Sequence, residues 1–224
     1  MNIQTDFSLK NYNTFGIEAK AMQFTSVQNT EELIEVLQLN KYIFVLGGGS
    51  NMLLTQNINK LVVHINIKGI SIFEENEDFV WVKANAGENW HEFVLWCIDH
   101  NYGGIENLSL IPGNVGTTPI QNIGAYGVEI KDMFSSCEAV NVAERTIKTF
   151  KKEDCNFGYR ESVFKNELKN KYIITSVVFK LTKKNHKTNS SYGAIEAELA
   201  KNNITNPTIK DISNAVIAIR KSKL

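Results

Sequence analysis

The chain has 224 residues, of which 43% are hydrophobic, enough to bury one large core or two smaller ones. Its 24 basic and 24 acidic residues cancel, so the positive charge that marks nucleic-acid-binding proteins is missing. No apolar run approaches membrane-spanning length, and the first residues lack the apolar core of a secretory signal. We therefore expect a cytoplasmic protein with no nucleic-acid partner and no membrane insertion.

The cysteines and histidines indicate no metal site. Cys97, Cys137 and Cys155 stand at wide spacings that match neither a zinc site nor a disulfide framework. The four histidines show no ligand spacing either. We expect three reduced, structural thiols and no bound metal.

In the first half of the chain, helix and strand signals alternate, as in an α+β protein. Residues 29–32 form a capping box before an amphipathic helix, and the apolar run 42–46 predicts a strand that ends in a glycine turn. Short strands are expected next at residues 61–65 and 79–84. A second amphipathic helix then ends near Gly103. Each helix has one apolar face, made by Leu33, Ile34 and Leu37 in the first and by Trp90, Phe93, Val94, Cys97 and Ile98 in the second.

The second half predicts a hairpin, a long strand and a last helix. Residues 137–142 and 146–151 have the pattern of two paired strands, and the β-branched run 172–181 predicts a third. The polar segment 182–191 is typical of a mobile loop. The last helix begins at about Thr208 and turns its apolar residues inward, namely Ile209, Ile212, Val216 and Ile219.

The first glycine-rich segment, Gly47-Gly48-Gly49-Ser50-Asn51, follows a predicted strand. Glycine accepts a positive φ and has no Cβ, so such a turn can direct several backbone N–H groups at one phosphate. It is not a Walker loop, which would need a lysine after Gly49, nor a Rossmann fingerprint, which would need a third glycine near Met52. Taken alone, the segment is also compatible with a tight turn between strands.

The second glycine-rich segment covers residues 110–127. Gly113 and Gly116 have the spacing of the loop in a KH domain, but the basic, helical setting of that RNA-binding module is missing. Its small residues can instead lie flat against a ring. Together the two segments predict a large cofactor that carries phosphate.

The chain resembles a known family in five motifs that occur in the family's order. They are Gly47-Gly48-Gly49-Ser50-Asn51, Ala86-Gly87-Glu88-Asn89-Trp90, Ile111-Pro112-Gly113, Pro119-Ile120-Gln121-Asn122-Ile123-Gly124-Ala125-Tyr126-Gly127 and Phe157-Gly158-Tyr159-Arg160-Glu161-Ser162. This set resembles the UDP-N-acetylenolpyruvoylglucosamine reductases, flavoenzymes of peptidoglycan precursor synthesis, and it covers nearly the whole chain.

The resemblance implies an α+β fold with two FAD-binding subdomains, of the vanillyl-alcohol-oxidase/CO-dehydrogenase-flavoprotein type. Part of a substrate-binding α+β domain would follow. The expected boundaries are residues 1–69 and 70–181 for the two subdomains and 182–224 for the start of the substrate domain. We expect a monomer.

The resemblance also implies a cofactor and a co-substrate. FAD would be held without a covalent bond, because no histidine stands between Gly47 and Asn51, and NADPH would reduce it. The residues expected at FAD are Gly47, Gly48, Gly49, Ser50, Asn51, Pro112, Gly113, Gly116, Thr117, Gln121, Asn122, Gly124 and Ala125.

The implied reaction adds hydride to C3 and a proton to C2 of an enolpyruvyl ether carried by a UDP-sugar. Hydride addition builds negative charge on the substrate carboxylate, which a fixed cation stabilises most in the transition state. Arg160 matches the position of that catalytic cation, and its planar guanidinium can hold a carboxylate through two hydrogen bonds. The residues expected at the substrate are Tyr126, Tyr159, Tyr192, Arg220 and Lys223.

Simpler interpretations exist for three of these residues. Tyr192 lies at the end of the polar loop, where it would close over the UDP, but a tyrosine at such a place also packs half-buried. Arg220 and Lys223 also suit the carboxyl end of a helix, whose partial negative charge attracts cations.

The chain departs from the family in one respect. The family continues with a Gly-Ser-Phe-Phe motif, whose serine is the expected proton donor, and with a later glutamate, whereas this sequence stops at Leu224. If the sequence is complete, we expect the overall reduction to be crippled. If it is a fragment, the parent protein is the full enzyme. Two alternatives stay open: a FAD oxidoreductase of this fold with another substrate, and a non-catalytic flavin-binding remnant.

Overall fold

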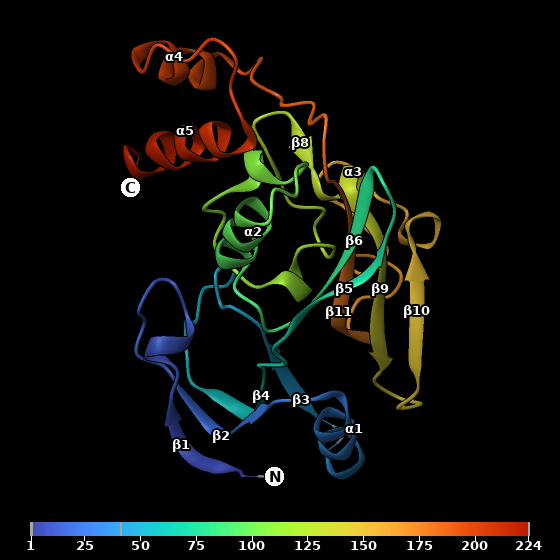
Figure 1. The fold of residues 1–224 in the computed structure, drawn as a ribbon. Coiled ribbons are helices and arrows are strands. Elements are labelled where there is room, and N and C mark those ends of the chain that lie inside the picture. Colours follow the sequence, from blue (N-terminus) through green and yellow to red (C-terminus); the bar gives the residue numbers. More distant parts are fainter. Residues whose placement is uncertain (1, 41, 224) are drawn as a thin grey trace.

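The computed structural model describes residues 2–40 and 42–223. Two sheets lie side by side, and a pair of helices extends from the second sheet at the carboxyl end of the chain (Figure 1). All strands of the first sheet fall within residues 4–65 and all strands of the second within residues 70–182. The domain boundaries expected from the sequence stay a prediction.

The first sheet has the order β1-β2-β4-β3. Its first strand is antiparallel to the second, and the other pairs are parallel. The elements are β1 (Gln4–Ser8), β2 (Lys20–Val27), α1 (Thr30–Leu39), β3 (Ile43–Leu46) and β4 (Ile58–Ile65). As predicted, α1 is capped by Asn29, whose side chain accepts a hydrogen bond from the amide of Glu32 (2.8 Å). A 3₁₀ turn, Lys10–Tyr12, joins β1 to β2.

The second sheet is antiparallel throughout and has the order β10-β9-β11-β6-β5. Its strands are β5 (Ile70–Glu75), β6 (Phe79–Asn85), β9 (Phe134–Asn141), β10 (Ile147–Lys151) and β11 (Tyr172–Thr182). The hairpin and the long strand expected from the sequence are confirmed. Shorter elements lie around this sheet: β7 (Gly124–Ala125), β8 (Val128–Glu129), α3 (Ile130–Met133) and 3₁₀ turns at Glu106–Leu108, Val115–Thr117 and Lys152–Cys155.

Helix α2 (Trp90–Asp99) covers this sheet with the apolar face predicted for it. The ring centroids of Trp90 and Phe93 lie 5.7 and 5.1 Å from that of Phe179 on β11. The predicted end of α2 near Gly103 was wrong. Asn101 takes the left-handed conformation (φ 57°), and the amides of Asn101 and Tyr102 bond back to Ile98 and Cys97, so asparagine replaces the expected glycine stop.

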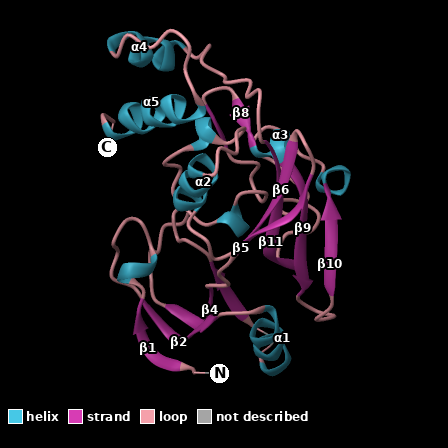
Figure 2. Cartoon of the chain, in the orientation of Figure 1, coloured by secondary structure: helices cyan, strands magenta, loops and turns pink. Residues whose placement is uncertain are grey.

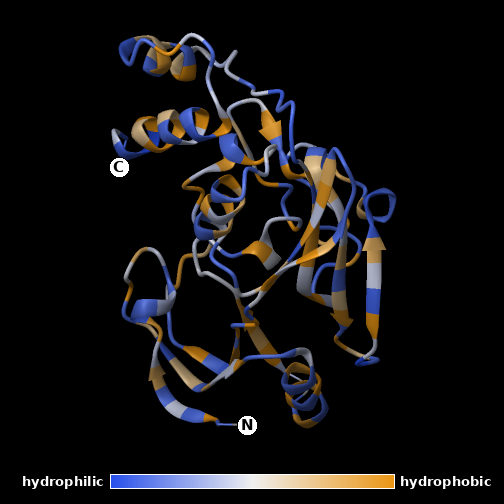
Figure 3. Ribbon diagram, in the orientation of Figure 1, coloured by the Kyte–Doolittle hydropathy of each residue, from blue (hydrophilic) through white to orange (hydrophobic). Residues whose placement is uncertain are grey.

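Two helices follow the second sheet, α4 (Gly193–Lys201) and α5 (Ile209–Lys221). The predicted start of α5 is confirmed, since Thr208 and Asp211 cap each other's backbone amides. The two helices share a small core of their own, with Ile195, Leu199, Ile212, Val216 and Ile219 buried in it. Figure 3 shows apolar and polar residues alternating along both helices. Helix α4 and strands β1, β2 and β5 were not expected from the sequence, because they carry many polar or exposed residues.

No helix of the described ranges is long and apolar enough to cross a lipid bilayer. Cys97, Cys137 and Cys155 are buried and unbridged. Figure 2 shows helices beside both of the larger sheets, which agrees with the expected α+β class.

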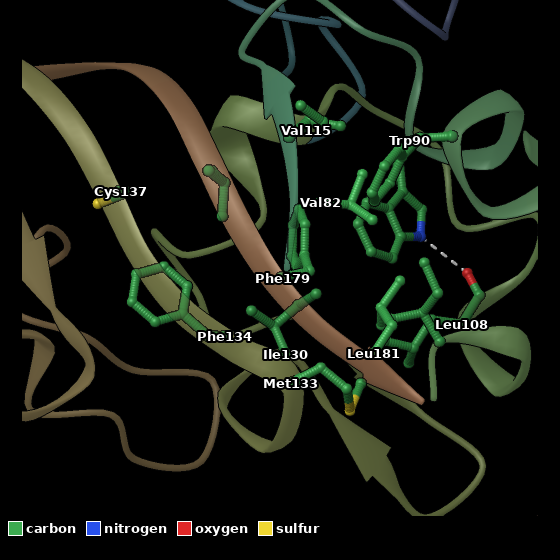
Figure 4. Packing of buried hydrophobic residues seen from close by; sticks show 14 of the residues in the cluster. Val82, Trp90, Leu108, Val115, Ile130, Met133, Phe134, Cys137, Phe179 and Leu181 are labelled. Carbon is green, nitrogen blue, oxygen red and sulfur yellow. Dashed lines mark hydrogen bonds between the residues drawn. The ribbon is translucent and has the colours of Figure 1, made fainter. Parts of the chain in front are cut away.

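The largest fully buried side chain, Trp90, makes a testable hydrogen bond. Its indole N–H donates to the carbonyl of Leu108 (2.9 Å) inside the core (Figure 4). We predict that Trp90→Phe lowers the free energy of unfolding by about 1–3 kcal/mol, because a buried carbonyl loses its donor. Urea denaturation measures this. Trp81→Phe, on the half-buried face of β6, serves as control; an equal loss in the two variants would contradict the role of the hydrogen bond.

Candidate functional site

The two glycine-rich segments meet in space. A strap of chain, residues 108–117, leads into the second segment and lies against the turn after β3. A Cβ on Gly48 would stand 2.9 Å from the Cα of Gly113, and a Cβ on Gly47 would stand 2.8 Å from the Cγ2 of Thr117. Just beyond the strap, Gln121 accepts a hydrogen bond from the side chain of Asn51 (3.2 Å). The two glycine-rich segments are therefore direct neighbours, as expected if both serve one site.

Gly49 shows most clearly why the turn needs glycine. Its φ is +62°, and a Cβ there would lie 2.0 Å from the carbonyl oxygen of Tyr12. Phosphate binding is one reason for glycine in this turn. The structure adds a second reason, which is the close packing of the turn against the strap and against Tyr12.

The backbone amides of residues 48–51 form no hydrogen bond to any other residue in the described ranges. They border a cavity of about 620 Å³, within the range of about 300–1,000 Å³ that small-molecule sites occupy. Free N–H groups in a glycine turn are a suitable lining for the oxygens of a diphosphate.

Nine of the predicted cofactor residues line this cavity. They are Gly47, Gly48, Gly49, Ser50, Asn51, Pro112, Gly116, Thr117 and Gln121. Four others do not line it. These are Gly113, Asn122, Gly124 and Ala125.

The far part of the cavity was not predicted. It is mostly apolar and lies where the edge of the first sheet faces β9 and β11 of the second. Its lining consists of Ile43, Val45, Ile65, Val142, Tyr172, Ile173 and Ile174, with Lys165, Lys169 and Asn170 at one side. These residues come from distant segments, so no local motif indicates them.

Arg160 also lines the cavity, at the tip of a tight turn. Gly158 and Glu161 close the turn by mutual backbone hydrogen bonds of 3.0 and 3.3 Å, and Arg160 has a positive φ of 56°. One guanidinium nitrogen donates to the carbonyl of Gly124 (2.6 Å). Lys165 donates to the carbonyl of Arg160 (2.9 Å) and to Glu161 (3.1 Å).

The turn with Arg160 is held against the second glycine-rich segment by buried side chains. Asn122, which is fully buried, donates to the carbonyl of Gly158 (2.8 Å) and accepts from the amide of Lys131 (3.0 Å). Ser162 donates to the carbonyl of Ile120 (2.6 Å). Asn122 therefore supports the turn that carries Arg160.

Strained backbone occurs in the second glycine-rich segment and in the turn that carries Arg160. Leu110, Asn122, Tyr126 and Arg160 all have left-handed φ values, between 41° and 57°. Each such residue costs about 1–3 kcal/mol and persists only where surrounding contacts enforce it. Strain of this kind is typical of functional sites.

The predicted substrate residues lie outside the cavity lining. Tyr126 and Tyr192 pack edge to face with ring centroids 5.3 Å apart, and Arg220 donates from Nε to the carbonyl of Leu110 (3.0 Å). Tyr159 is 82% exposed, and Lys223 is exposed after α5. The structure thus brings together Tyr126 and Tyr192, and it places Tyr159 next to Arg160 in the turn.

The loop that precedes Tyr192 is fastened at two points. Thr182 and His186 share a hydrogen bond of 2.6 Å, and Asn107 donates to the carbonyls of Asn189 (2.8 Å) and Tyr126 (3.3 Å). The mobility expected for residues 182–191 stays a prediction.

The residues present fit a flavin dinucleotide. The glycine turn offers free amides for a diphosphate, the strap offers backbone and small side chains, and the far part offers an apolar recess for a ring. No histidine borders the glycine turn, in keeping with a cofactor that is not covalently bound.

Comparisons with known proteins agree with this geometry. Residues 22–150 match the family model described as FAD binding domain. A UDP-N-acetylenolpyruvoylglucosamine reductase of Flavobacterium johnsoniae is 67% identical over 226 residues, which cover 100% of this chain and 67% of that protein. One of Amoebophilus asiaticus is 45% identical with the same coverage. The chain thus spans about two thirds of the length of these relatives.

Solved structures share the fold. The UDP-N-acetylenolpyruvylglucosamine reductase of Thermus caldophilus superposes with a TM-score of 0.68 at 23% identity, over 98% of this chain and 69% of that one. A solvent-stable cholesterol oxidase superposes with a TM-score of 0.56 at 15% identity, over 80% of this chain and 37% of that one. The two-subdomain FAD-binding fold expected from the sequence is thereby confirmed.

Gly49 provides a test of the packing in the turn. We predict that Gly49→Ala lowers the free energy of unfolding by at least about 1–2 kcal/mol, because the new Cβ meets Tyr12 and the residue must keep a left-handed φ. Thermal or urea denaturation measures this. Gly193→Ala is the matched control, since a Cβ there meets nothing within 4 Å; a Gly49→Ala variant as stable as this control would rule out the packing argument.

Proposed function

Because this chain belongs to the UDP-N-acetylenolpyruvoylglucosamine reductase family, we propose that it binds FAD in the cavity between the glycine turn and β11. With NADPH as reductant, it reduces the enolpyruvyl ether of UDP-N-acetylglucosamine to UDP-N-acetylmuramate, a precursor of peptidoglycan. One observation carries the assignment to this site: Arg160 stands at the cavity whose other wall is the glycine turn.

FAD, when bound, carries the hydride from NADPH to the enolpyruvyl group. The chain supplies binding and orientation. The free amides of residues 48–51 receive the phosphate oxygens, with Ser50 and Asn51 adding side-chain hydrogen bonds, and Pro112, Gly116, Thr117 and Gln121 border the cofactor from the strap side. Gly113, Asn122, Gly124 and Ala125 do not line the cavity; Asn122 and Gly124 act on the site through their hydrogen bonds to the turn of Arg160.

Arg160 stabilises the charge that develops on the substrate carboxylate during hydride addition. Its hydrogen bond to Gly124 fixes one edge of the guanidinium and leaves the other N–H groups for the carboxylate. Because Lys165 and Asn122 hold the turn, the cation is oriented before substrate arrives, so little reorganisation is needed in the transition state. We assign the proton donor for C2 to none of the residues of this chain.

The substrate nucleotide lies on the side of α4 and α5. Tyr192 and Tyr126 form an aromatic pair there that a nucleotide base or sugar can pack on, and Tyr159 is exposed beside the catalytic arginine. Arg220 and Lys223 supply cations for the diphosphate of the UDP-sugar. On the same basis we assign residues 1–69 and 70–181 to the two FAD-binding subdomains. Residues 182–224 are then the start of the substrate-binding domain.

We further propose that the protein works as a monomer in the cytoplasm. NADPH and nucleotide sugars are metabolites of that compartment, and three buried, unbridged cysteines agree with reducing surroundings. Size-exclusion chromatography with light scattering tests the oligomeric state.

The cofactor assignment is tested by mixing the purified chain with FAD. We expect a yellow protein after removal of free FAD, whose colour NADPH bleaches. A folded chain that takes up no FAD would overturn the proposal. A yellow protein that NADPH reduces but that ignores the enolpyruvyl substrate would indicate another FAD oxidoreductase, and one that NADPH cannot bleach would indicate a non-catalytic flavin-binding protein.

For Arg160, we predict that Arg160→Ala slows re-oxidation by the enolpyruvyl substrate about 10²–10³-fold, the usual effect of removing one group that stabilises a developing oxyanion. Reduction by NADPH should change little. Arg160→Lys should recover only part of the rate, because lysine lacks the planar pair of donors. Stopped-flow spectroscopy measures the two half-reactions separately.

The matched control is Arg145→Ala. Arg145 also sits in a turn with a positive φ, but its side chain bonds to Leu37, away from the cavity. Equal losses in both half-reactions of Arg160→Ala, or a loss as large in Arg145→Ala, would remove Arg160 from the catalytic role.

A further inference from the structure

The strap that borders the cavity is anchored mainly to the beginning of α2 and the residues before it. The backbone amide of Trp90 donates to the carbonyl of Gly113 (2.9 Å). The amides of Val115 and Gly116 donate to Glu88 and Ala86 (2.9 and 3.0 Å). These bonds fix the second half of the strap, whereas the first half, with Leu110 to Pro112, is held differently.

Leu110 is held from both sides in a strained conformation. Its φ is 57°, in the left-handed region that a leucine avoids. Its amide donates to Nδ1 of His91 on α2 (3.0 Å), and its carbonyl accepts from Nε of Arg220 on α5 (3.0 Å). Ile111 and Pro112, which follow directly, line the cavity. The direction in which the strap enters the cavity wall therefore depends on these two hydrogen bonds.

His91 can accept this bond only in one state. Nδ1 must be unprotonated, so the ring must be neutral, with its proton on Nε2. Burial lowers the pKa of His91 below its ordinary value of 6.5, an effect that Glu92 on its own helix opposes and Lys221 on α5 reinforces. The guanidinium of Arg220 lies on the carbonyl side of the same leucine.

We propose that His91 is a positioning residue for the cofactor, whose neutral ring holds Leu110 in the left-handed turn and thereby sets Ile111 and Pro112 against the bound flavin. This rests on the proposed function, because it takes the cavity to be the FAD site. Protonation removes the acceptor and directs a ring N–H at the amide of Leu110. The turn then relaxes, and the affinity for FAD falls.

The direction of the pH effect follows from linkage. Above pH 6.5 the ring is neutral in both the held and the relaxed turn, so the hydrogen bond is intact. Below pH 6.5 the relaxed state binds a proton more readily than the held state, since Nδ1 is free to take a proton only when its bond to the Leu110 amide is broken. Acid therefore favours the relaxed turn, and FAD binding weakens as the pH falls below about 6.5.

Two variants of similar shape separate the hydrogen bond from packing. In His91→Asn, the side-chain oxygen can take the place of Nδ1 and cannot be protonated near neutral pH. In His91→Leu, the shape is similar but the acceptor is gone. His100→Asn is the control, because His100 caps the other end of α2 and bonds to Trp96.

FAD binding to the full chain is measured by fluorescence titration at about pH 8 and about pH 5.5. We expect the wild-type chain and His100→Asn to bind FAD several-fold more weakly at the lower pH. The extra weakening should be absent in His91→Asn. His91→Leu should bind FAD about ten-fold more weakly at both pH values, because the amide of Leu110 loses its partner. An acid response in His91→Asn equal to that of the wild type, or normal affinity in a folded His91→Leu, would overturn the proposal.

A second measurement needs no cofactor. Nuclear magnetic resonance of the chain alone should show His91 protonated on Nε2 at pH 8 and the Leu110 amide protected from hydrogen exchange, with protection kept in His91→Asn and lost in His91→Leu. A proton on Nδ1 would overturn the proposal. If the wild-type chain takes up no FAD at any pH, the proposed function fails and the positioning role fails with it. If FAD binds and all His91 variants behave alike, only the inference about His91 fails.

Discussion

The site depends on a contact between backbones that leaves no room for side chains. The glycine turn after β3 lies so close to Tyr12 and to the strap that a single Cβ at Gly48 or Gly49 would overlap main-chain atoms. The turn and the strap thereby form one wall that consists largely of backbone. Within the described chain, the amides of residues 48–51 in the turn have no partners, so they can serve a ligand.

The proposed reaction also requires a cation in a fixed place, and we assign that role to Arg160. The turn that carries Arg160 is strained, and buried polar groups such as Asn122 and Ser162 tie it to the second glycine-rich segment. Catalysis by a charge favours such an arrangement, because a cation that is already oriented pays little reorganisation energy when negative charge develops. The strained backbone and the hydrogen bonds of the turn thus both hold the guanidinium in place.

The strap also links the two sides of the proposed reaction. It borders the cofactor cavity through Ile111 and Pro112, and it contacts α5, the helix on the substrate side, through Ser109 and Leu110. Ser109 shares a buried hydrogen bond of 2.8 Å with Ser213 on that helix. A short chain of hydrogen bonds therefore connects α5 to the cavity wall.

The sequence by itself determined the elements with strong periodicity, the glycine turn and the family. Capped amphipathic helices such as α1 and α5 and the β-branched β11 are specified by local patterns, and the ordered motifs identified the family. It could not reveal the apolar recess, because Ile43, Val142 and Ile173 meet only when the two sheets pack. Nor could it reveal that Asn122, expected at the cofactor, is buried and supports the turn of Arg160. Tertiary structure decided these points because each depends on contacts between segments far apart in the chain, which no local pattern encodes.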